Sequence, residues 1–527
     1  MTMCRYTDVY IILDNELRLS CEAQVNILIF KMPKMQNSKL ASIRKWIEPY
    51  NISGEVFKIL NNTTVFCQHC QKPVTAEKKF QIDQHTKSLL HEKCLNKSSK
   101  QIFVHEASTS IENQSQFFKE LCNTLISLNI PLYKLENKNF KSFLEKYTKK
   151  HIPDESILIK NYLNQCYTDV LQNIREIIGS SYIFFSVDET TDPRGKYVAN
   201  FIVGKLNADS PSKSYLLTSK VLKKTNNSTI AQFVNNSLKL LWPEGNNDNK
   251  VLLMLSDAAP YMTKAAQNLK PFYSNIVHVT CVAHGIHRIA EKIIDTFSDI
   301  NNLINNGKKV FSKAPYRIQL YKKILPNTHL PPQPIITRWG TWLESAFFYA
   351  DHFEEFKNVI ENLEDNAKCI QNCKSIFNKL NVKYDLAYIK ANFVCIVESI
   401  KKLETSNLSL VDSLKILEQV ENSVNEVPIS VNSTIIKTKC KNVLNKNKGL
   451  TVLKEISKIF QGDSANFNDL SVPNHSPDIL ANFKYAMITS VDVERSFSSY
   501  KYILTDRRHN FTEINMEHTL ITYCFSN

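Results

Sequence analysis

Residues Tyr182–Asp192 read YIFFSVDETTD, and they decide the fold class of this chain. The mostly apolar run Tyr182–Val187 predicts a buried strand, and the acidic side chain of Asp188 follows it directly. A second stretch, Val251–Ala259, repeats the arrangement: VLLML predicts another buried strand, and Asp257 follows after one serine. In α/β sheets, chemically active side chains gather at the carboxyl ends of strands. The two aspartates therefore mark the expected site.

The pattern around the two aspartates predicts a mixed α/β core. The expected elements are strands at Tyr182–Val187, Tyr197–Leu206, Ser214–Leu222, Val251–Leu255 and Ile276–Thr280, and helices at Ser228–Leu241, Tyr261–Leu269 and His284–Ile294. Ser228 is the expected N-cap of the first of these helices. Three strands, a helix, and then alternating strands and helices form an order that resembles ribonuclease-H-like folds. We therefore expect such an α/β core within a multidomain α+β protein.

Residues 301–480 are expected to be mostly helical. Three helices in this region are predicted by apolar residues that recur every three to four positions, at Asp351–Leu363, Val382–Thr405 and Leu408–Val424. Gly462 predicts the end of the helical region, and the polar stretch Ser464–Pro477 predicts a linker.

Two cysteines and two histidines near the N-terminus have the spacing of a small zinc finger. The four residues are Cys67, Cys70, His85 and His91, in the pattern Cys-x2-Cys-x14-His-x5-His. Two thiolates on a tight turn and two imidazoles on a helix can bind Zn²⁺ tetrahedrally. His69 and Cys94 are nearby alternatives with poorer spacing. The competing interpretation is two free cysteines and two incidental histidines.

Positive charge is concentrated around this motif. The chain has a net charge of +14, and residues 31–100 hold thirteen Lys and Arg against five Asp and Glu. Four lysines on or beside the histidine-bearing segment are candidates for phosphate contacts: Lys78, Lys79, Lys87 and Lys93. The alternative for this segment is an ordinary basic, solvated surface. We expect double-stranded DNA as the partner, bound with an affinity that falls steeply with salt.

Composition argues against several other classes of protein. The chain has 527 residues, 43% hydrophobic and 22% charged, which is typical of a soluble protein with several domains. Its ten glycines form no phosphate-binding loop, so we expect no nucleotide hydrolysis and no small-molecule cofactor. Membrane association is not expected, because no apolar run reaches the ~18 residues that span a bilayer. Thirteen scattered cysteines without a secretory signal predict a reduced, intracellular protein.

Five motifs, in order, resemble the hAT transposase superfamily. They are Val187–Asp192, Ser256–Ala259, Cys281–His284, Thr337–Trp339 and Val493–Ser498, the last of which contains Glu494. The resemblance covers about residues 170–525. It implies DNA cleavage and strand transfer by a metal-binding triad of Asp188, Asp257 and Glu494. It implies, too, that residues 301–480 are an all-helical insertion into the core. It also implies a C-terminal dimerisation region, and hence a homodimer or higher oligomer.

The chemistry of phosphoryl transfer agrees with such a triad. Two Mg²⁺ or Mn²⁺ ions about 3.5–4 Å apart can activate water or a 3′-hydroxyl and stabilise the leaving oxygen. Glu189 and Asp192 are weaker candidates, because the side chain after Asp188 points to the other face of an extended strand. The alternative is that Asp188 is one of many carboxylates found at strand ends by chance.

The remaining hAT-like motif residues have structural or DNA-handling interpretations. Cys281 and His284 are too few to form a zinc site, and we expect a strand-to-helix corner near the active site. His287 adds a weak possibility of metal binding there. Trp339, next to Arg338, is expected to brace the start of the insertion, and the family resemblance also implies a role in handling flanking DNA.

The N-terminal region resembles a different family. Phe66–His91, Phe117–Cys122, Leu128–Leu132 and the segment as far as Leu144 look like the CGG-triplet-repeat-binding, BED-like finger proteins of the nucleus. This resemblance covers about residues 55–170 and implies DNA binding and a nuclear location. Gln116–Ser127 is expected to form a helix that Pro131 stops.

These expectations divide the chain into six regions. They are a leader with some disorder (1–54), a BED-like zinc finger (55–110), a helical linker domain (111–175), the first part of the core (176–300), the helical insertion (301–480), and the end of the core with the dimerisation region (481–527). One functional hypothesis is a hAT-type transposase that uses Zn²⁺ in the finger and Mg²⁺ or Mn²⁺ in the core. The alternative is a catalytically silent, domesticated nuclear protein that binds DNA and regulates transcription. A nuclease unrelated to transposition has little support beyond the fold.

Overall fold

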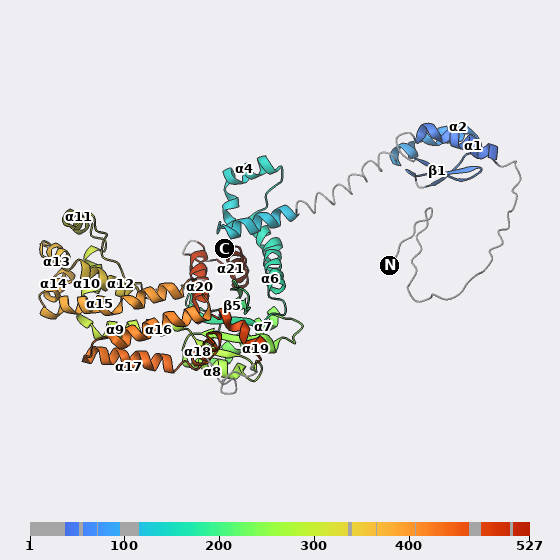
Figure 1. The fold of residues 1–527 in the computed structure, drawn as a ribbon. Coiled ribbons are helices and arrows are strands. Elements are labelled where there is room, and N and C mark those ends of the chain that lie inside the picture. Colours follow the sequence, from blue (N-terminus) through green and yellow to red (C-terminus); the bar gives the residue numbers. More distant parts are fainter. Residues whose placement is uncertain are drawn as a thin grey trace. The chain divides into compact units, whose positions relative to one another are not determined.

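The computed structural model describes residues 37–51, 56–70, 72–94, 115–335, 340–364, 366–405, 407–462, 476–505, 508 and 510–527. The chain forms two compact units, Met1–Asn113 and Gln114–Asn527, which we describe separately (Figure 1). The second unit is a mixed α/β structure with many helices. Among the described helices, none is long and apolar enough to cross a membrane.

The first unit is a three-stranded antiparallel sheet with short helices. Its elements are α1 (Asn37–Ile47), the 3-10 turn η1 (Glu48–Tyr50), β1 (Phe57–Asn61), β2 (Thr64–Cys67), β3 (Lys72–Thr75), α2 (Lys79–Thr86) and a helix over residues 89–94. The strand order is β1-β2-β3, with Phe57 opposite Cys67. Phe57, Val65 and Ile82 are fully buried between the sheet and the helices and form a small core.

Helix α1 is part of this small core, although the sequence predicted a leader as far as residue 54. Ile43 and Ile47 are one helical turn apart, so both point into the core, where they are buried. Tyr50 then donates a hydrogen bond of 2.5 Å to Asp83 on α2. Asn51 Oδ1 accepts from the backbone N–H groups of Val56 and Phe57 at 2.8 and 2.9 Å. These contacts fasten residues 37–51 to the predicted finger.

The second unit is built on a five-stranded sheet of order β6-β5-β4-β7-β8. The strands are β4 (Ile183–Thr191), β5 (Tyr197–Lys205), β6 (Ser214–Leu222), β7 (Val251–Ser256) and β8 (Val277–Thr280). β5 is antiparallel to β4 and β6, whereas β7 is parallel to β4 and β8 is parallel to β7. All five predicted strands are therefore present, and β6 has the predicted bounds.

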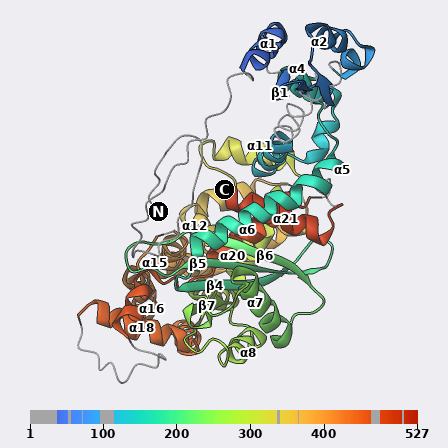
Figure 2. The same cartoon turned by 90° about the vertical axis from the view of Figure 1, so that its right-hand side faces the viewer.

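Helices cover both faces of this sheet. Those that position the site are α6 (Asn164–Ile178), α7 (Asn227–Leu241), α8 (Pro260–Leu269), α9 (Val282–Thr296), α20 (Val491–Ile503) and α21 (Glu513–Ser526), and the 3-10 turn η4 (Asp248–Lys250) leads into β7. Viewed along the sheet, α6, α20 and α21 lie on one side and α7 and α8 on the other (Figure 2). On the α7 side, Phe185 stacks on Phe201 with ring centroids 4.9 Å apart, and Phe233 of α7 packs edge-on to Phe201. Because both faces are covered, every residue of β7 is buried.

A helical segment precedes the sheet in the second unit. It consists of a helix over residues 115–127, η2 (Leu132–Glu136), α4 (Lys138–Thr148), α5 (Glu155–Leu158), the wider turn η3 (Ile159–Leu163) and then α6. The predicted helix at Gln116–Ser127 is confirmed, but Pro131 does not stop it. Asn129 adopts a left-handed conformation with φ 51°, and its N–H bonds to Ile126 O at 2.9 Å. The helix therefore ends in a left-handed C-terminal turn, two residues before the proline.

The described part of the predicted insertion (301–480) contains helices and connecting segments but no strand. Its helices are α10 (Ser298–Phe311), α11 (Pro315–Ile324), α12 (Thr341–Asp351), α13 (Phe353–Glu361), α14 (Lys368–Phe377), α15 (Leu380–Leu403), α16 (Leu410–Glu426), α17 (Val431–Asn445) and α18 (Lys448–Phe460), followed by α19 (Pro477–Ala481) and η6 (Asn482–Tyr485). The helices predicted at Val382–Thr405 and Leu408–Val424 are confirmed by α15 and α16. The helix predicted at Asp351–Leu363 is shorter at both ends, because α12 ends at Asp351 and α13 spans Phe353–Glu361. Of the predicted linker, residues 464–475 lie outside the described residues.

Two smaller expectations are corrected near the sheet. β4 continues to Thr191, so Asp188 does not end its strand; the antiparallel ladder with β5 extends to Thr191 opposite Tyr197. The N-cap of α7 is Asn226 and not Ser228. Asn226 Oδ1 accepts from the backbone N–H of Thr229 at 3.0 Å, and Thr229 Oγ1 accepts from the N–H of Asn226. Asn226 therefore begins a capping box one residue before the helix starts.

Residues at the start of α18 cover the outer edge of strand β8. Asn447 accepts from the backbone N–H of Thr280 at 3.1 Å and donates to its carbonyl at 2.6 Å, as a neighbouring strand would. A Cβ at Gly449 would overlap the backbone carbonyl of His278. The insertion is thereby fixed to the sheet immediately before Cys281 and His284.

We predict that Gly449→Ala destabilises the second unit. The added methyl group has no space between α18 and the backbone of β8, so the helix must move away, at a cost of about 3 kcal/mol in the free energy of unfolding. Thermal melting of the full chain measures the effect. Thr451→Ala, an exposed change on the same helix, is the matched control and should melt like the parent. Equal melting temperatures for the two variants would contradict the close approach.

Candidate functional site

The four predicted zinc ligands converge in the first unit. The ligand atoms of Cys67, Cys70, His85 and His91 all lie within 4.8 Å of one another. His91 Nδ1 lies 3.4 Å from Cys67 Sγ, 3.3 Å from Cys70 Sγ and 3.2 Å from His85 Nε2. Tetrahedral Zn²⁺, with Zn–S of about 2.3 Å and Zn–N of about 2.0 Å, requires S···N and N···N separations of about 3.5 and 3.3 Å. The Cys2His2 group therefore fits one zinc ion.

The two histidines lie on two helices and not on one, which corrects the expectation from the sequence. On a continuous helix, six residues of about 100° each would turn the second imidazole about 240° from the first. Instead, α2 ends at Thr86 and a new helix runs over residues 89–94. Ser88 holds this break, because its Oγ donates to His85 O at 2.7 Å and accepts from His91 N at 3.2 Å. The break allows both imidazoles to face the cysteines.

The surroundings of the histidines favour their metal-binding form. Burial lowers the pKa of His85, and burial together with the charges of His85 and His69 lowers the pKa of His91. Neutral imidazoles, which ligate metals, are therefore favoured at neutral pH. Burial, a hydrogen bond to Cys67 and the charges of Cys67 and Cys94 raise the pKa of Cys70 to about 12. A cation at the centre of the group opposes that rise, because it stabilises the thiolate.

The two alternative ligands lie beside the group. The ring of His69 packs edge-on to His91 with centroids 5.9 Å apart. Cys94 packs against the core of the first unit and is close enough to Cys70 to raise its pKa. Neither residue belongs to the set of mutually close donor atoms found among the described residues. The predicted choice of four ligands therefore agrees with the geometry.

The four candidate DNA-binding lysines surround the two helices that carry the histidines. Lys78 is the N-cap of α2, Lys79 is its first residue and Lys87 is its C-cap, while Lys93 lies on the helix over residues 89–94. All four side chains are exposed. The sequence did not single out Phe80, whose ring is 58% exposed between these lysines. Cationic groups and an apolar ring thus share one accessible region of the first unit.

A second cluster of acidic groups forms in the second unit through strand register. β4 and β7 are parallel, with Ser186 opposite Leu255 as the last pair of the ladder. Two residues further along the chain are Asp188 on β4 and Asp257 just beyond the end of β7, so both lie at the same edge of the sheet. The face of β4 that carries Asp188 also carries Phe184, which packs with α9 and the insertion. The sheet thus brings the two predicted aspartates together.

Two side chains from helices lie beside Asp188: Glu494 from the first turn of α20, and His284 from the first turn of α9. The ligand atoms of Asp188, His284 and Glu494 lie within 4.8 Å of one another. His284 Nε2 is 3.5 Å from Glu494 Oε1. Asp257 is not part of this tight group, but its charge is close enough to raise the pKa of Asp188. From the sequence, Asp188, Asp257 and Glu494 were predicted to be ligands, whereas His284 was predicted only to lie near the active site.

The charges in this cluster are tightly linked. Burial raises the pKa of Asp188 well above its usual range, the charge of His284 lowers it, and the charges of Asp257 and Glu494 raise it further. Burial lowers the pKa of His284, but hydrogen bonds to Cys281 and Glu494 outweigh it and raise the pKa to about 11. A protonated His284 therefore neutralises part of the negative charge when no metal is bound. Crowded carboxylates around a buried Asp suit a hard divalent cation.

Cys281 forms the strand-to-helix corner that the sequence predicted. It is the N-cap of α9, and its Sγ accepts a hydrogen bond of 3.2 Å from the backbone N–H of Ser490. Val282 N donates to Ile488 O at 2.9 Å in the same place. These two bonds attach the segment before α20 to the start of α9. They therefore help to bring Glu494 to His284.

Three further polar residues at this site were not expected. The hydroxyl of Tyr261, on the first turn of α8, donates to Glu189 Oε1 on the opposite face of β4 from Asp188. Asn200 lies directly opposite Asp188 in the ladder, and its Nδ2 donates to Ser496 Oγ of α20 at 2.7 Å. Within the described part of the chain, Glu189 Oε2 and Asn200 Oδ1 are buried and have no hydrogen-bond partner in the protein. The signal for Tyr261 was its place on the helix that directly follows Asp257.

Other predicted residues are not part of this cluster. Arg338 and Trp339 lie outside the described residues, so their roles remain predictions. His287 pairs with Glu291 one helical turn away, at 3.5 Å. Asp192 binds Arg194 at 2.9 Å and accepts from Tyr500 at 3.3 Å, so it fastens α20 to the end of β4. Its role is therefore a structural one.

Part of the second unit matches a known family model. Residues 153–310 match the model of a domain of unknown function, DUF659. DUF659 occurs in hAT-type, transposase-like proteins. In this chain the domain spans the whole five-stranded sheet, with Asp188, Asp257 and His284, whereas Glu494 and the Cys2His2 group lie outside it. No curated protein matches the chain.

Proposed function

We propose that this protein is a hAT-type transposase, or a protein derived from one, that recognises DNA through its zinc finger and cleaves it with an Asp188–Asp257–Glu494 triad. The proposal rests on one observation. Glu494 lies beside Asp188, although the two residues are 306 positions apart in the chain, and Asp257 follows the end of the neighbouring strand β7. The strand order β6-β5-β4-β7-β8, with three antiparallel and two parallel strands, supports a ribonuclease-H-like core. The DUF659 match supports a transposase-like origin.

The three carboxylates have the chemistry that phosphodiester cleavage needs. When bound, a pair of Mg²⁺ or Mn²⁺ ions activates the attacking oxygen and stabilises the leaving oxygen. Asp188 is rigid, because it projects from a central strand whose two neighbours are hydrogen-bonded to it. Glu494 is held by His284, and Asn200 fixes α20 through Ser496. The chain thus supplies preorganised negative charge, with His284 as a countercharge.

A cleavage assay tests this proposal directly. The substrate is DNA that carries the terminal inverted repeats flanking the gene, with Mg²⁺, Mn²⁺ or a chelator added to the full chain. Nicking that requires the metal and the repeats supports the transposase. DNA binding without cleavage under all metal conditions would instead support the silent, transcription-regulating protein. The exposed lysines around the Cys2His2 group are compatible with either outcome.

We also propose a nuclear homodimer, which the hAT-like C-terminal region supports. Tyr502 and Ile514 of this region are 61% and 62% exposed, whereas the neighbouring Ile503 and Leu520 are buried in the core. The region therefore offers apolar side chains beyond those that close the sheet. Light scattering of the full chain gives the oligomeric state.

We predict that DNA affinity falls steeply with salt and depends mainly on residues 31–170. Each lysine that contacts a phosphate contributes about −0.9 to the slope of log K against log salt, because it releases a counterion. Replacing both Lys79 and Lys87 with glutamine should therefore make the slope shallower by about 2 and weaken binding to every sequence alike. Electrophoretic or fluorescence titrations at several salt concentrations measure this.

The matched control removes the same number of positive charges at another place in the chain. Lys223 and Lys224 are exposed in the turn between β6 and α7, so their double glutamine variant should keep the slope of the parent. If the control loses as much affinity as the Lys79 and Lys87 variant, the finger is not the main DNA contact.

A further inference from the structure

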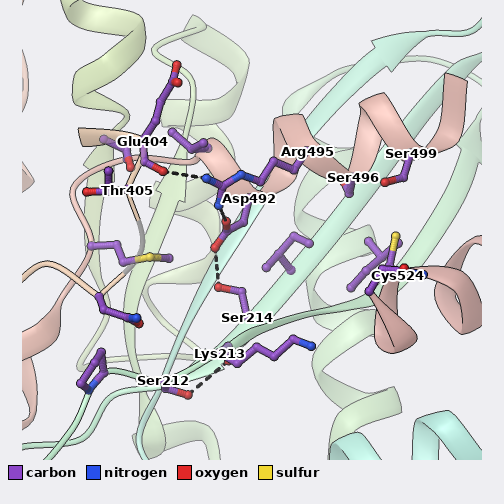
Figure 3. A pocket seen from close by; sticks show the side chains of 18 of the residues that line it. Ser212, Lys213, Ser214, Glu404, Thr405, Asp492, Arg495, Ser496, Ser499 and Cys524 are labelled. Carbon is purple, nitrogen blue, oxygen red and sulfur yellow. Dashed lines mark hydrogen bonds and ion pairs between the residues drawn. The ribbon is translucent and has the colours of Figure 1, made fainter. Parts of the chain in front are cut away.

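A network of polar side chains joins the helical insertion to the helix that carries Glu494. Arg495 is the next residue after Glu494, and its side chain extends into a cavity of about 720 Å³ beside α20 (Figure 3). Arg495 Nη1 lies 2.7 Å from Asp492 Oδ1 on the same helix. Arg495 Nη2 donates to the backbone carbonyl of Glu404 at 2.6 Å. Asp492 Oδ2 in turn accepts from Ser214 Oγ at 2.5 Å.

Three segments meet in this network. Glu404 is the C-cap of α15, the 24-residue helix of the insertion, and Ser214 is the first residue of β6. The last carbonyls of a helix carry partial negative charge and lack intrahelical partners. The planar guanidinium fork of Arg495 can satisfy one of them while it holds Asp492, which a lysine cannot do with the same geometry. Arg495 thus ties the end of α15 to the first turn of α20.

The surroundings of Arg495 leave room for movement. The cavity separates the end of α15 from α20 and is bordered by Lys213, Thr405 and Asn407. The guanidinium crosses this space, and the Arg495 side chain is 53% exposed. Elsewhere the insertion packs firmly, since α17 and α15 contact α9 and α18 contacts β8. A shift of α15, which is about 36 Å long, would therefore reach α20 through this polar link.

We propose that Arg495 is a positioning residue, which sets the place of Glu494 by coupling α20 to the helical insertion. This inference rests on the proposed function of Glu494 as a metal ligand. Asp492 and Arg495 lie on the cavity side of α20, and Glu494 lies about 100° from Arg495 on the same turn, facing His284. Rotation or fraying of this turn therefore moves the carboxylate that must reach Asp188. Binding of DNA to the insertion would act on the site through the same route.

The test compares Arg495→Ala, Arg495→Lys and the control Lys501→Ala, an exposed residue of the same helix. We expect Arg495→Ala to lower kcat for metal-dependent cleavage about 10- to 100-fold, as loss of a residue that orients a metal ligand does. KM for the DNA should change less than about twofold, because Arg495 binds protein groups and the lysines of the finger are left unchanged. Arg495→Lys should recover part of kcat, and Lys501→Ala should match the parent.

Two outcomes overturn the proposal. An unchanged kcat in Arg495→Ala shows that the link does not position Glu494. A loss that appears wholly in KM or in DNA affinity shows that Arg495 contacts DNA instead. A folded Arg495→Ala protein is expected, because a half-exposed ion pair contributes little to stability.

Hydrogen exchange separates failure of this proposal from failure of the proposed function. If the parent does not cleave DNA, the function of the triad fails, but the coupling can still be measured. Backbone amides of α20 should exchange faster in Arg495→Ala than in the parent, and those of Lys501→Ala should not. Equal exchange in α20 of all three proteins would refute the coupling itself.

Discussion

Asp188→Asn is expected to lower the rate of metal-dependent DNA cleavage by about 10³-fold or more while leaving the protein folded and bound to DNA. Asparagine has nearly the same size and can keep the hydrogen bond from the backbone N–H of Glu189 to Asp188 Oδ1, which is 2.8 Å long. What it removes is the negative charge at the centre of the cluster. Burial already disfavours a lone charge there, as the raised pKa of Asp188 indicates. A cation held as proposed would offset this cost by stabilising the charged carboxylate.

The same reasoning extends to Asp257→Asn and Glu494→Gln, each of which should reduce cleavage by orders of magnitude. Glu418→Gln is the matched control, because Glu418 is an exposed carboxylate on α16 of the insertion. Circular dichroism and DNA affinity verify that each variant is folded. Cleavage that survives any one of the three changes would exclude this triad. A variant that loses DNA binding together with cleavage would point to a structural role.

Removing zinc is expected to unfold the finger part of the first unit. The buried core there is small, with Phe57, Val65 and Ile82 at its centre, and the four ligands lie inside it. In zinc fingers of this kind, metal binding contributes about 10–16 kcal/mol near neutral pH and drives folding. We therefore expect one Zn²⁺ per chain, and Cys67→Ala should lose both the metal and the protection of residues 57–94 from proteolysis. Binding should also weaken as the pH falls, because the ligands must be deprotonated.

Cys94→Ser provides a sharp control for this prediction. Cys94 lies near Cys70, yet it is outside the group of four donors. The variant should keep its zinc and its resistance to proteolysis. Retention of zinc in Cys67→Ala, with loss in Cys94→Ser, would mean that the ligand set has been assigned wrongly.

The sequence predicted the strands of the second unit well, because their signals are local. Each strand is a short apolar run between turn residues, and β6 has the bounds that its pattern predicted. The ends of helices were harder to predict, because each depends on the backbone conformation and capping of one or two residues. Asn226 caps α7, and the left-handed Asn129 ends the helix before Pro131. The break after Thr86 was missed for the same reason, although the His-x5-His spacing already disfavoured one straight helix.

The composition of the acidic cluster could be predicted only in part. Asp188 and Asp257 each follow a recognisable strand, but their alignment depends on the parallel register of β4 and β7, which is a tertiary property. His284 was noted in its motif, but its contact with Glu494 joins residues 210 positions apart. Asn200 carries no distinctive local signal, and Tyr261 is marked only by its place on the helix that directly follows Asp257. They become visible only when the sheet brings neighbouring strands together.

The order of the two sites along the chain has a consequence for shortened products of this gene. The Cys2His2 group is complete by His91, whereas the acidic cluster is completed only by Glu494, 33 positions before Asn527. A chain that terminates early, anywhere between residues 114 and 493, keeps the whole first unit and cannot assemble the cluster. Truncation therefore acts in one direction. If the proposed function holds, truncation would turn a DNA-cutting protein into a competitor for the same DNA, and shortened copies would restrain intact ones.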